Sequence, residues 1–488
     1  MARNGREASS SFAEWRLPKA LGAIGLIAAS SATLVGAPRA VSAGLPGDRL
    51  EFIMYGRMGM GWSLHGQNVQ GQVMNLTDHG IGGRLEEGDY VEPTIKLHVL
   101  KPEKEDKSGT WVDATLTTPM FARNGSFMSL LANNTNNTLG IELFQAFVEA
   151  GNVFVPKLSF WGGARFYRGT DVHISDYFYF NDLSGQGGGA KYKNFEVAVL
   201  AYTGEGSSYP GYNFSSTPAM AAAADVHRVR TVFTAQYKHE FGDSGNTLQG
   251  LAELHTVPAP SLSLGGRELA KADHGAVIGA KLHLELGNAQ FNDLSVRYGS
   301  RIANGAYGGA KTWQTFGPPG QEGTYEGAMG IEVVEHFLLN FGSIASLNGY
   351  GIFHYDKAPD KVAGKVIDGV IVDDTGKDVS PTHVIDFAVG VRSLIYAHRQ
   401  FHMVNEVTYQ GRKDGDRDMG TAWKFSVVPT IVPKGETIAW SRPHMRLIYT
   451  AGIYNQAAVT QHLSPYLRAT GSASQFAHYI GARSEWWF

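Results

Sequence analysis

The chain contains no cysteine, and only 18% of its 488 residues are charged. The absence of cysteine excludes a disulfide framework, a thiolate metal site and a cysteine nucleophile. Lysine and arginine do not exceed the acidic residues, so the charge balance does not favour nucleic-acid binding. One helix-length apolar run is present, which excludes a bundle of membrane-spanning helices. Glycine (60 residues) and aromatic residues (11%) are abundant instead, and this composition is typical of a β-barrel.

The N-terminal segment predicts export. Residues 1–19 carry four basic and two acidic residues, residues 20–37 are largely apolar, and Ala40-Val41-Ser42-Ala43 places small residues before a cleavage point. This order is that of a secretory signal peptide over residues 1–43. The alternative is an uncleaved membrane anchor, but the apolar run is short and interrupted by hydroxyl residues. We expect one mature domain, residues 44–488, in the envelope of a Gram-negative cell.

The mature chain is rich in short segments with a period of two. From Phe52 to Trp62, one face is almost wholly apolar and the other carries Tyr55 and Arg57. The segments around residues 95–99, 293–298 and 444–449 alternate in the same way. Such strands have lipid on one side and water on the other, and in lipid the sheet must close because an open edge leaves backbone groups unsatisfied. A soluble β-sandwich is the alternative, but its core would be unusually large for one domain.

Turn-rich stretches, among them Ser184–Gly189 and Gly411–Gly415, are expected between these strands. The last segment, Ile480–Phe488, is itself an amphipathic strand that finishes on an aromatic residue. This pattern resembles outer-membrane barrels, in which the terminal aromatic is the assembly signal. The resemblance therefore gives Phe488 that role and implies the barrel-assembly machinery as a partner.

Five motifs carry a more specific resemblance. Residues 160–180 read FWGGARFYRGTDVHISDYFYF, which is similar to the run of the maltoporin family that leads into its pore loop. Tyr55–Trp62, Phe291–Tyr298, Trp440–Arg446 and Glu485–Phe488 resemble other strands of that family, in the family's order. The resemblance implies an all-β, transmembrane antiparallel barrel of eighteen strands with an inward-folded constriction loop. It also implies a homotrimer and passive, sugar-selective diffusion of maltodextrins or other oligosaccharides.

Sugars present hydroxyl rims and flat apolar faces, so a selective pore needs aromatic rings beside polar groups. The resemblance assigns an aromatic slide to Tyr55, Phe291, Trp440 and Trp487. In the slide, these residues point into the lumen. The alternation of the strands supports this inward direction independently, since each of the four shares a face with charged residues, opposite a largely apolar row. The resemblance assigns a polar track to Arg57, Arg84, Asp171 and Asp176, and His173 lies in the same motif.

The sequence also departs from the family's pattern. Glu92 replaces a slide tyrosine, Thr94 replaces a track glutamate, and Gly169 aligns with the constriction arginine, for which Arg168 is a neighbouring substitute. Phe178 replaces the tyrosine that narrows the pore, and Phe144 aligns loosely with a further arginine. The slide tryptophan that a neighbouring subunit contributes has only Phe121 or Phe127 as candidates. These changes predict a more acidic and less aromatic pore mouth and leave the preferred sugar open.

Other functions remain as alternatives. A barrel enzyme would need more than the Gly-Asp-Ser-Gly string within Phe241–Gly245, which reads as a turn, or the loose phosphate-loop likeness of Gly185–Lys191. Since no convincing catalytic triad accompanies these strings, we expect no enzyme. No His-Glu-x-x-His motif occurs, so we expect no catalytic metal, and we expect no cofactor. A general or anion-preferring porin is a further alternative, because lumen arginines could form a path for anions. The acidic residues of the polar track argue against this alternative.

An adhesive barrel that serves as a phage receptor is the last alternative. The expected partners are an oligosaccharide substrate, outer-membrane lipid and lipopolysaccharide, other copies of the chain, the assembly machinery and a phage as a further candidate. Nucleic acid is excluded.

Overall fold

The structure is a computed structural model, and it describes most of the chain from residue 49 onward. The described residues are 49–77, 81–102, 108–122, 125–127, 139–202, 229–259, 263–264, 267–268, 271–305, 315–320, 323–362, 365–373 and 376–488. The predicted signal peptide, residues 1–43, lies outside the described residues, so the structure does not test this prediction.

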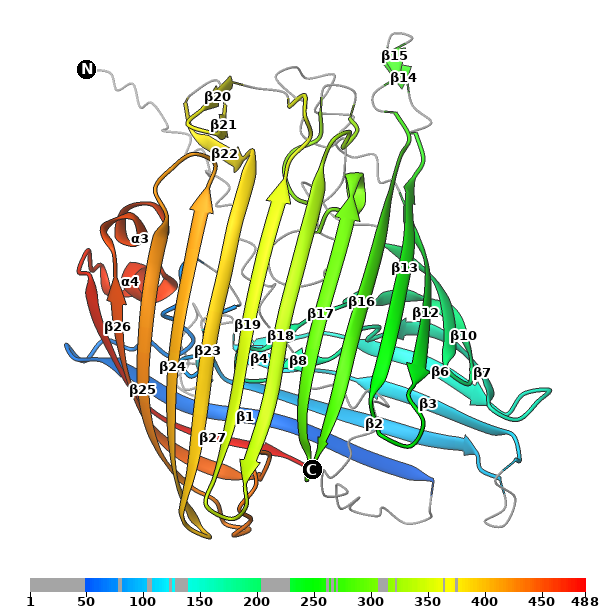
Figure 1. The fold of residues 1–488 in the computed structure, drawn as a ribbon, viewed down its shortest axis with the longest axis horizontal. Helices are drawn as coiled ribbons and strands as arrows, with labels where there is room; N and C mark the ends of the chain where they lie inside the picture. Colours follow the sequence, from blue (N-terminus) through cyan, green and yellow to red (C-terminus); the bar gives the residue numbers. More distant parts are fainter. Residues whose placement is uncertain are drawn as a thin grey trace, which may run out of the picture.

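Eighteen long strands of the described residues form one closed antiparallel barrel (Figure 1). Each strand pairs with the next along the chain, and the last pairs with the first. The expected eighteen-stranded barrel is therefore confirmed. The barrel strands are β1 Leu50–Ser63, β2 Tyr90–Leu100, β3 Trp111–Thr117, β6 Gln145–Gly151, β7 Leu158–Arg165, β10 Gly185–Tyr192, β11 Phe195–Tyr202, β12 Arg230–Glu240, β13 Thr247–Val257, β16 Asp273–Gly287, β17 Gln290–Ser300, β18 Met329–Phe341, β19 Ala345–Lys357, β23 His383–His398, β24 Phe401–Asp414, β25 Gly420–Ile431, β26 His444–Tyr454 and β27 Phe476–Trp487.

Short elements occupy the connections. They are the strands β4 Met120–Ala122, β5 Leu139–Ile141, β8 Asp171–Val172, β9 Tyr177–Phe178, β14 Ser263–Leu264, β15 Arg267–Glu268, β20 Lys365–Ile367, β21 Val370–Val372 and β22 Asp378–Pro381, the 3-10 turn η3 Arg301–Ala303, and the helices α3 Gln456–Gln461 and α4 Pro465–Thr470. Within the part of the chain that is described, no helix is long and apolar enough to cross a membrane.

The two ends of the barrel differ in their connections. At one end the strands are joined by short turns such as residues 193–194, 288–289 and 399–400, and the C-terminus lies at this end (Figure 1). We call it the short-turn end. The opposite, long-loop end carries α3, α4 and the small sheet of β20, β21 and β22. This asymmetry is typical of outer-membrane barrels, in which the short turns face the periplasm.

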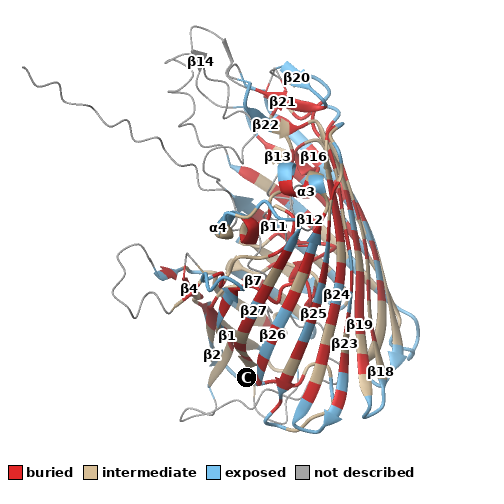
Figure 2. Cartoon of the chain, turned by 90° about the vertical axis from the view of Figure 1, so that its left-hand side faces the viewer, coloured by how far each residue is buried: buried red, intermediate tan, exposed pale blue. Residues whose placement is uncertain are grey.

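Burial alternates along the strands, as the period of two predicts (Figure 2). In β26, Met445, Leu447 and Tyr449 are 46%, 64% and 43% exposed on the outer face, whereas His444 and Arg446 are buried on the inner face. The predicted faces of β1, β17 and β27 follow the same rule. The outer surface is therefore apolar and suits lipid, and the inner surface carries the charges.

Two predicted turns were wrong. Most of Ser184–Gly189 belongs to strand β10, and β24 continues through Gly411 to Asp414. The glycines of β10 make room for neighbouring strands, since a Cβ atom at Gly189 would lie 2.5 Å from Nε1 of Trp161. Glycine here reflects close packing within the sheet rather than a turn.

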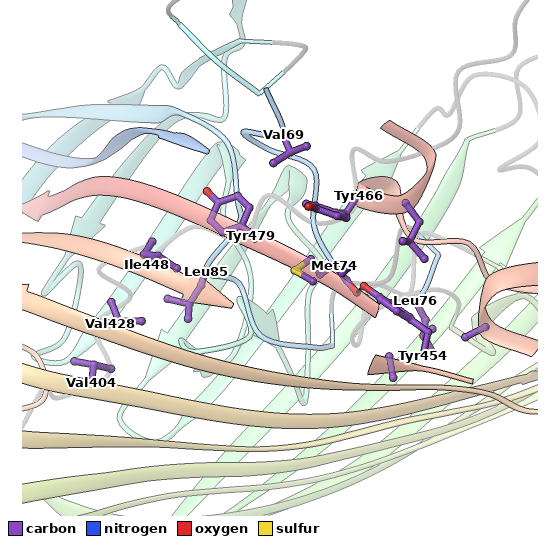
Figure 3. Packing of buried hydrophobic residues seen from close by; sticks show 14 of the residues in the cluster. Val69, Met74, Leu76, Leu85, Val404, Val428, Ile448, Tyr454, Tyr466 and Tyr479 are labelled. Carbon is purple, nitrogen blue, oxygen red and sulfur yellow. Dashed lines mark hydrogen bonds between the residues drawn. The ribbon is translucent and has the colours of Figure 1, made fainter. Parts of the chain in front are cut away.

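Within the described part of the chain, two connections from the long-loop end fold into the lumen. The first, residues 64–89 between β1 and β2, inserts Met74, Leu76 and Leu85 against inward-facing residues of the barrel wall. Figure 3 shows Leu85 near Val428 and Ile448 of β25 and β26, and Met74 and Leu76 near Tyr454. We call residues 64–89 the first loop. It covers the inner face of the C-terminal strands.

The second inward connection, residues 166–184 between β7 and β10, is the expected constriction loop. The Tyr177 hydroxyl donates to Glu332 of β18 (2.5 Å), and the Tyr179 hydroxyl donates to Asp293 of β17 (2.8 Å). Because these partners lie on strands far along the chain, the loop reaches across the lumen to another part of the wall. The prediction of an inward-folded loop is confirmed.

Candidate functional site

Two of the four predicted slide residues, Trp440 and Trp487, pack on one histidine, and Tyr55 lies beside Trp487. Tyr55 of β1 and Trp487 of β27 are direct register partners across the closing seam of the barrel. Trp440 lies in the connection between β25 and β26. The ring of His173, in the constriction loop, has its centroid 5.7 Å from those of Trp440 and Trp487, edge-on to both. Rings from the seam, a short-turn-end connection and the constriction loop therefore form one aromatic group.

Phe291 occupies a separate place on the wall. It faces inward on β17, with its ring stacked on His283 at 6.2 Å and edge-on to His336 at 4.9 Å. His336 also contacts Tyr179 of the constriction loop. Among the described residues, no ring contact joins Phe291 to the other three slide residues. Its predicted inward direction is confirmed, but the structure does not bring it into the His173 group.

The Tyr55 hydroxyl forms hydrogen bonds with two arginines of the polar track and with one carboxylate. It donates to Oε1 of Glu485 at 3.3 Å and accepts from Arg57 Nη1 (3.3 Å) and Arg84 Nη2 (3.1 Å). Both arginines also contact Glu87, at 3.2 and 2.7 Å. Burial opposes ionisation of Glu87, but the two guanidinium groups outweigh it and lower the pKa of this carboxyl.

One of the two predicted acidic residues, Asp176, joins the two inward loops. Arg84 of the first loop forms an ion pair with Asp176 of the constriction loop at 3.3 Å and donates to the His173 carbonyl at 3.2 Å. Asp171 lies 3.7 Å from Nδ1 of His173. Asp176 has a positive φ of 59°, a conformation that aspartate tolerates better than most residues. The four predicted track residues are thus brought together, with Arg57 linked to Arg84 through Tyr55 and Glu87.

Arg168 lies between two aromatic rings. Its guanidinium carbon is 3.9 Å from the ring centroids of both Phe166 and Phe178. Phe144 packs edge-on against Phe166 at 5.6 Å. Burial lowers the pKa of Arg168, and Asp182 opposes this shift. The arginine predicted beside Gly169 is therefore placed at the constriction, and Phe166 is a lining residue that sequence reasoning missed.

Glu92 and Thr94 lie on the inner face of β2. The Tyr90 hydroxyl donates to Glu92 at 2.6 Å, and the Tyr90 ring lies 6.1 Å from that of Tyr55. Thr94 shares a hydrogen bond of 2.8 Å with Thr117 of β3. Tyr90 was missed, although its position two residues before Glu92 on the same strand face could have identified it.

The remaining candidates have structural partners. Phe121, on β4, packs with Tyr55 and Tyr90 of its own barrel, and the Phe127 amide donates to Asp89 at 2.8 Å. Phe488 exchanges backbone hydrogen bonds with Met54, and its ring lies 6.0 Å from Phe52 on the outer surface.

Neither catalytic string forms a site. Phe241–Gly245 belongs to the turn between β12 and β13, where the Ser244 hydroxyl donates to the Phe241 carbonyl at 2.7 Å. Gly185–Lys191 lies in strand β10 rather than in a phosphate-binding loop. In the described part of the chain, no group of three or more His, Asp or Glu side chains is arranged to hold a metal.

A closed eighteen-stranded barrel with an apolar outer surface, a charged lumen and a constriction loop defines the class of outer-membrane porins. The sequence matches the family model described as LamB porin over residues 50–488. The chain therefore belongs to the LamB porin family, and it is a diffusion channel of the Gram-negative outer membrane.

Several solved outer-membrane proteins match this chain at low sequence identity. The outer membrane protein opdK from Pseudomonas aeruginosa matches with 10% identity and a TM-score of 0.42, over 90% of this chain and 98% of that one. An anion-selective porin from Comamonas acidovorans matches with 9% identity and a TM-score of 0.40, over 90% and 99%. OmpT of Vibrio cholerae matches with 9% identity and a TM-score of 0.38, over 92% and 100%. At these scores the likenesses add nothing to the family match.

Proposed function

We propose that this porin is selective for sugars, and that it passes maltodextrins or other oligosaccharides passively along the aromatic residues Tyr55, Trp487 and Trp440. The observation that carries the proposal is the packing of the Trp440 and Trp487 rings around His173, with Arg442 over Trp487. Tyr55 lies beside Trp487, and its hydroxyl accepts hydrogen bonds from Arg57 and Arg84. A sugar can lay its apolar face on the rings while its hydroxyls exchange hydrogen bonds with the charged groups. Phe291 would act as a separate contact on the opposite part of the path.

The same proposal gives roles to the constriction residues. Arg168, Phe178, Asp171 and Asp176 would contact the sugar where the lumen is narrowest, and Glu92 and Thr94 would line its approach along β2. Several weak sites in series permit release as well as binding, which a conducting pore requires. Glu92 replaces an aromatic residue, so the experiment below compares maltooligosaccharides with shorter sugars to find the preferred substrate.

The wider biological setting is also part of the proposal. A signal peptide over residues 1–43 would direct export, and residues 44–488 would form the mature domain. The barrel would assemble as a homotrimer with the help of the barrel-assembly machinery and would contact lipid and lipopolysaccharide through its apolar outer surface. The chain would act without a cofactor and without catalysis.

A general or anion-preferring porin is the second candidate. It is favoured by the lumen arginines Arg442 and Arg446, which share a single carboxylate, Glu485. Such a channel would pass small anions without binding sugars, because cationic walls select charge alone.

Single-channel conductance in a planar bilayer separates the two candidates. The purified mature protein is titrated with maltooligosaccharides, sucrose and glucose. We expect reversible blockade that strengthens with chain length, because a longer sugar contacts more rings. Ohmic conductance that no sugar reduces would contradict sugar selectivity and leave a general diffusion porin.

A further inference from the structure

A pocket in the inner wall below the constriction loop is lined by cationic side chains. It lies near the short-turn end, where β19, β23, β24, β25 and β26 meet the connection that carries Trp440 and the tip of the constriction loop. None of its lining residues is acidic. The polar and aromatic lining residues used below are Arg392, Arg442, Arg446, His402, Asn348 and Trp440.

The arginines that line this pocket outnumber the carboxylates that they contact. Arg392 is neutralised by Glu406, which it contacts at 2.5 Å. Arg442 and Arg446 share Glu485, at 3.5 and 3.0 Å, and His444 also contacts that carboxylate at 2.9 Å. Two guanidinium groups therefore have one carboxylate between them. Burial lowers the pKa of Arg442 to about 10, and Glu485 only partly opposes this shift.

Several polar atoms of the pocket lack a partner. Among the described residues, Nε of Arg446, Nε2 of His402 and Oδ1 of Asn348 make no hydrogen bond, although these side chains are only 8%, 2% and 2% exposed. Leaving buried polar atoms unsatisfied costs about 1–3 kcal/mol each, more for a charged group. An oxygen ligand that accepts hydrogen bonds from Arg446 and His402 would remove that cost for the two nitrogen atoms, whereas Oδ1 of Asn348 is itself an acceptor and needs a donor such as a sugar hydroxyl.

The pocket is small, and its size limits what can enter. Its volume is about 20 Å3, close to the space that a single water occupies. A planar carboxylate matches the fork of an arginine and fits such a space better than a bulkier tetrahedral phosphate. A sugar ring does not fit inside, but Trp440 at the pocket wall offers a flat surface for a ring that remains in the lumen.

We propose that this pocket is a subsite for the carboxylate of an acidic sugar, a uronate, whose ring stacks on Trp440 while Arg446 and His402 bind the carboxylate oxygens. The inference rests on the proposed sugar selectivity and names the substrate class that the channel prefers. Such a subsite differs from the wall of an anion-preferring porin, because here the cationic groups lie next to an aromatic ring, Trp440.

Matched ligands test the proposal without any substitution. Digalacturonic acid and its neutral dimethyl ester have the same rings and differ only in charge, so both are titrated against single-channel conductance of the native channel at pH 7. We expect half-maximal blockade by the acid at a concentration at least tenfold lower than by the ester. Equal potency of acid and ester would overturn the subsite, and so would equal potency of acetate, because the ring would then contribute nothing. Stronger binding of glucose 6-phosphate would overturn the choice of a carboxylate.

Variants then locate the site. Arg446→Gln and His402→Gln should each remove most of the tenfold preference for the acid, whereas Arg417→Gln, which removes one positive charge from a rim ion pair with Asp378, should preserve it. Heat-dependent gel migration shows whether each barrel is folded, and the His402 variant keeps the test valid if the Arg446 variant is not. If both folded variants kept the tenfold preference for the acid over the ester, the site would not lie at Arg446 and His402. Absence of blockade by every sugar, neutral or acidic, would instead refute the proposed function itself.

Discussion

At the residue scale, His173 connects parts of the lumen that are far apart in sequence. Its ring contacts Trp440 and Trp487, its carbonyl accepts from Arg84, and its Nε2 lies 3.5 Å from Glu485. The guanidinium carbon of Arg442 lies 4.1 Å from the Trp487 ring centroid. These contacts fix the orientation of the aromatic rings, so that little side-chain freedom is lost when a sugar binds.

Substitution of the two tryptophans tests this arrangement. Trp440→Ala and Trp487→Ala should each weaken sugar binding by about 1–2 kcal/mol, roughly 5- to 30-fold in Kd, while ion conductance persists or rises. The measurement is the concentration dependence of sugar blockade in single channels. Trp423→Ala is the matched control, because Trp423 is 43% exposed on the outer face of β25. Unchanged affinity in both lumen variants would show that the slide is assigned wrongly.

At the element scale, the first loop is anchored to the wall by one buried lysine. Lys424 of β25 donates to Asn75 (2.9 Å), to the Gly83 carbonyl (2.8 Å) and to Glu86 (2.7 Å) of that loop. The Lys424 and Glu86 side chains are almost completely buried. Burying such a pair is costly, but removing only one partner is costlier, since the other charge is left uncompensated.

Lys424→Met should therefore release the first loop. We expect a loss of about 3–5 kcal/mol in the local stability of the loop, faster proteolysis within residues 64–89 and a higher single-channel conductance. The double variant Lys424→Met/Glu86→Gln removes both charges and should recover much of the protease resistance. If the single variant were as resistant as the native protein, the lysine would not be the anchor.

At the scale of the whole molecule, the barrel depends on the seam between β1 and β27. Residues from Tyr55 to Ser63 pair with residues from Trp487 back to Tyr479. Glycine at position 59 permits this close approach, because a Cβ atom there would lie 2.3 Å from the Ala482 carbonyl oxygen and 3.0 Å from the Arg483 Cα. Both atoms belong to the backbone and cannot rotate away.

Gly59→Val should consequently weaken closure. Forcing the strands apart should cost about 1–3 kcal/mol, as overpacking does in protein cores, and should lower the temperature at which the compact barrel unfolds on a heat-modifiable gel. Gly250→Val on β13 is the control, because a Cβ atom there would have no heavy atom within 4 Å. A native transition temperature in the Gly59 variant would mean that the seam adapts without cost.

The motifs and the strand alternation predicted the barrel and the inner direction of Tyr55, Arg57 and Trp487, since a period of two fixes the face of every residue in a strand. They also identified the constriction loop. They misassigned Ser184–Gly189, because glycine marks turns and tight sheet packing alike. They missed Tyr90, which shares a strand face with Glu92, and Phe166, whose place beside Arg168 depends on how the constriction loop folds.

By itself, the sequence determined which side chains face lipid and which face the lumen, because that choice is local to each strand and follows from its polarity. Only the tertiary structure decided which lumen residues meet. Arg446, His402 and Asn348 belong to three different strands, and Trp440 and His173 to two connections. Strand register and the path of the inward loops bring them to one pocket, and these depend on contacts between residues that are distant along the chain.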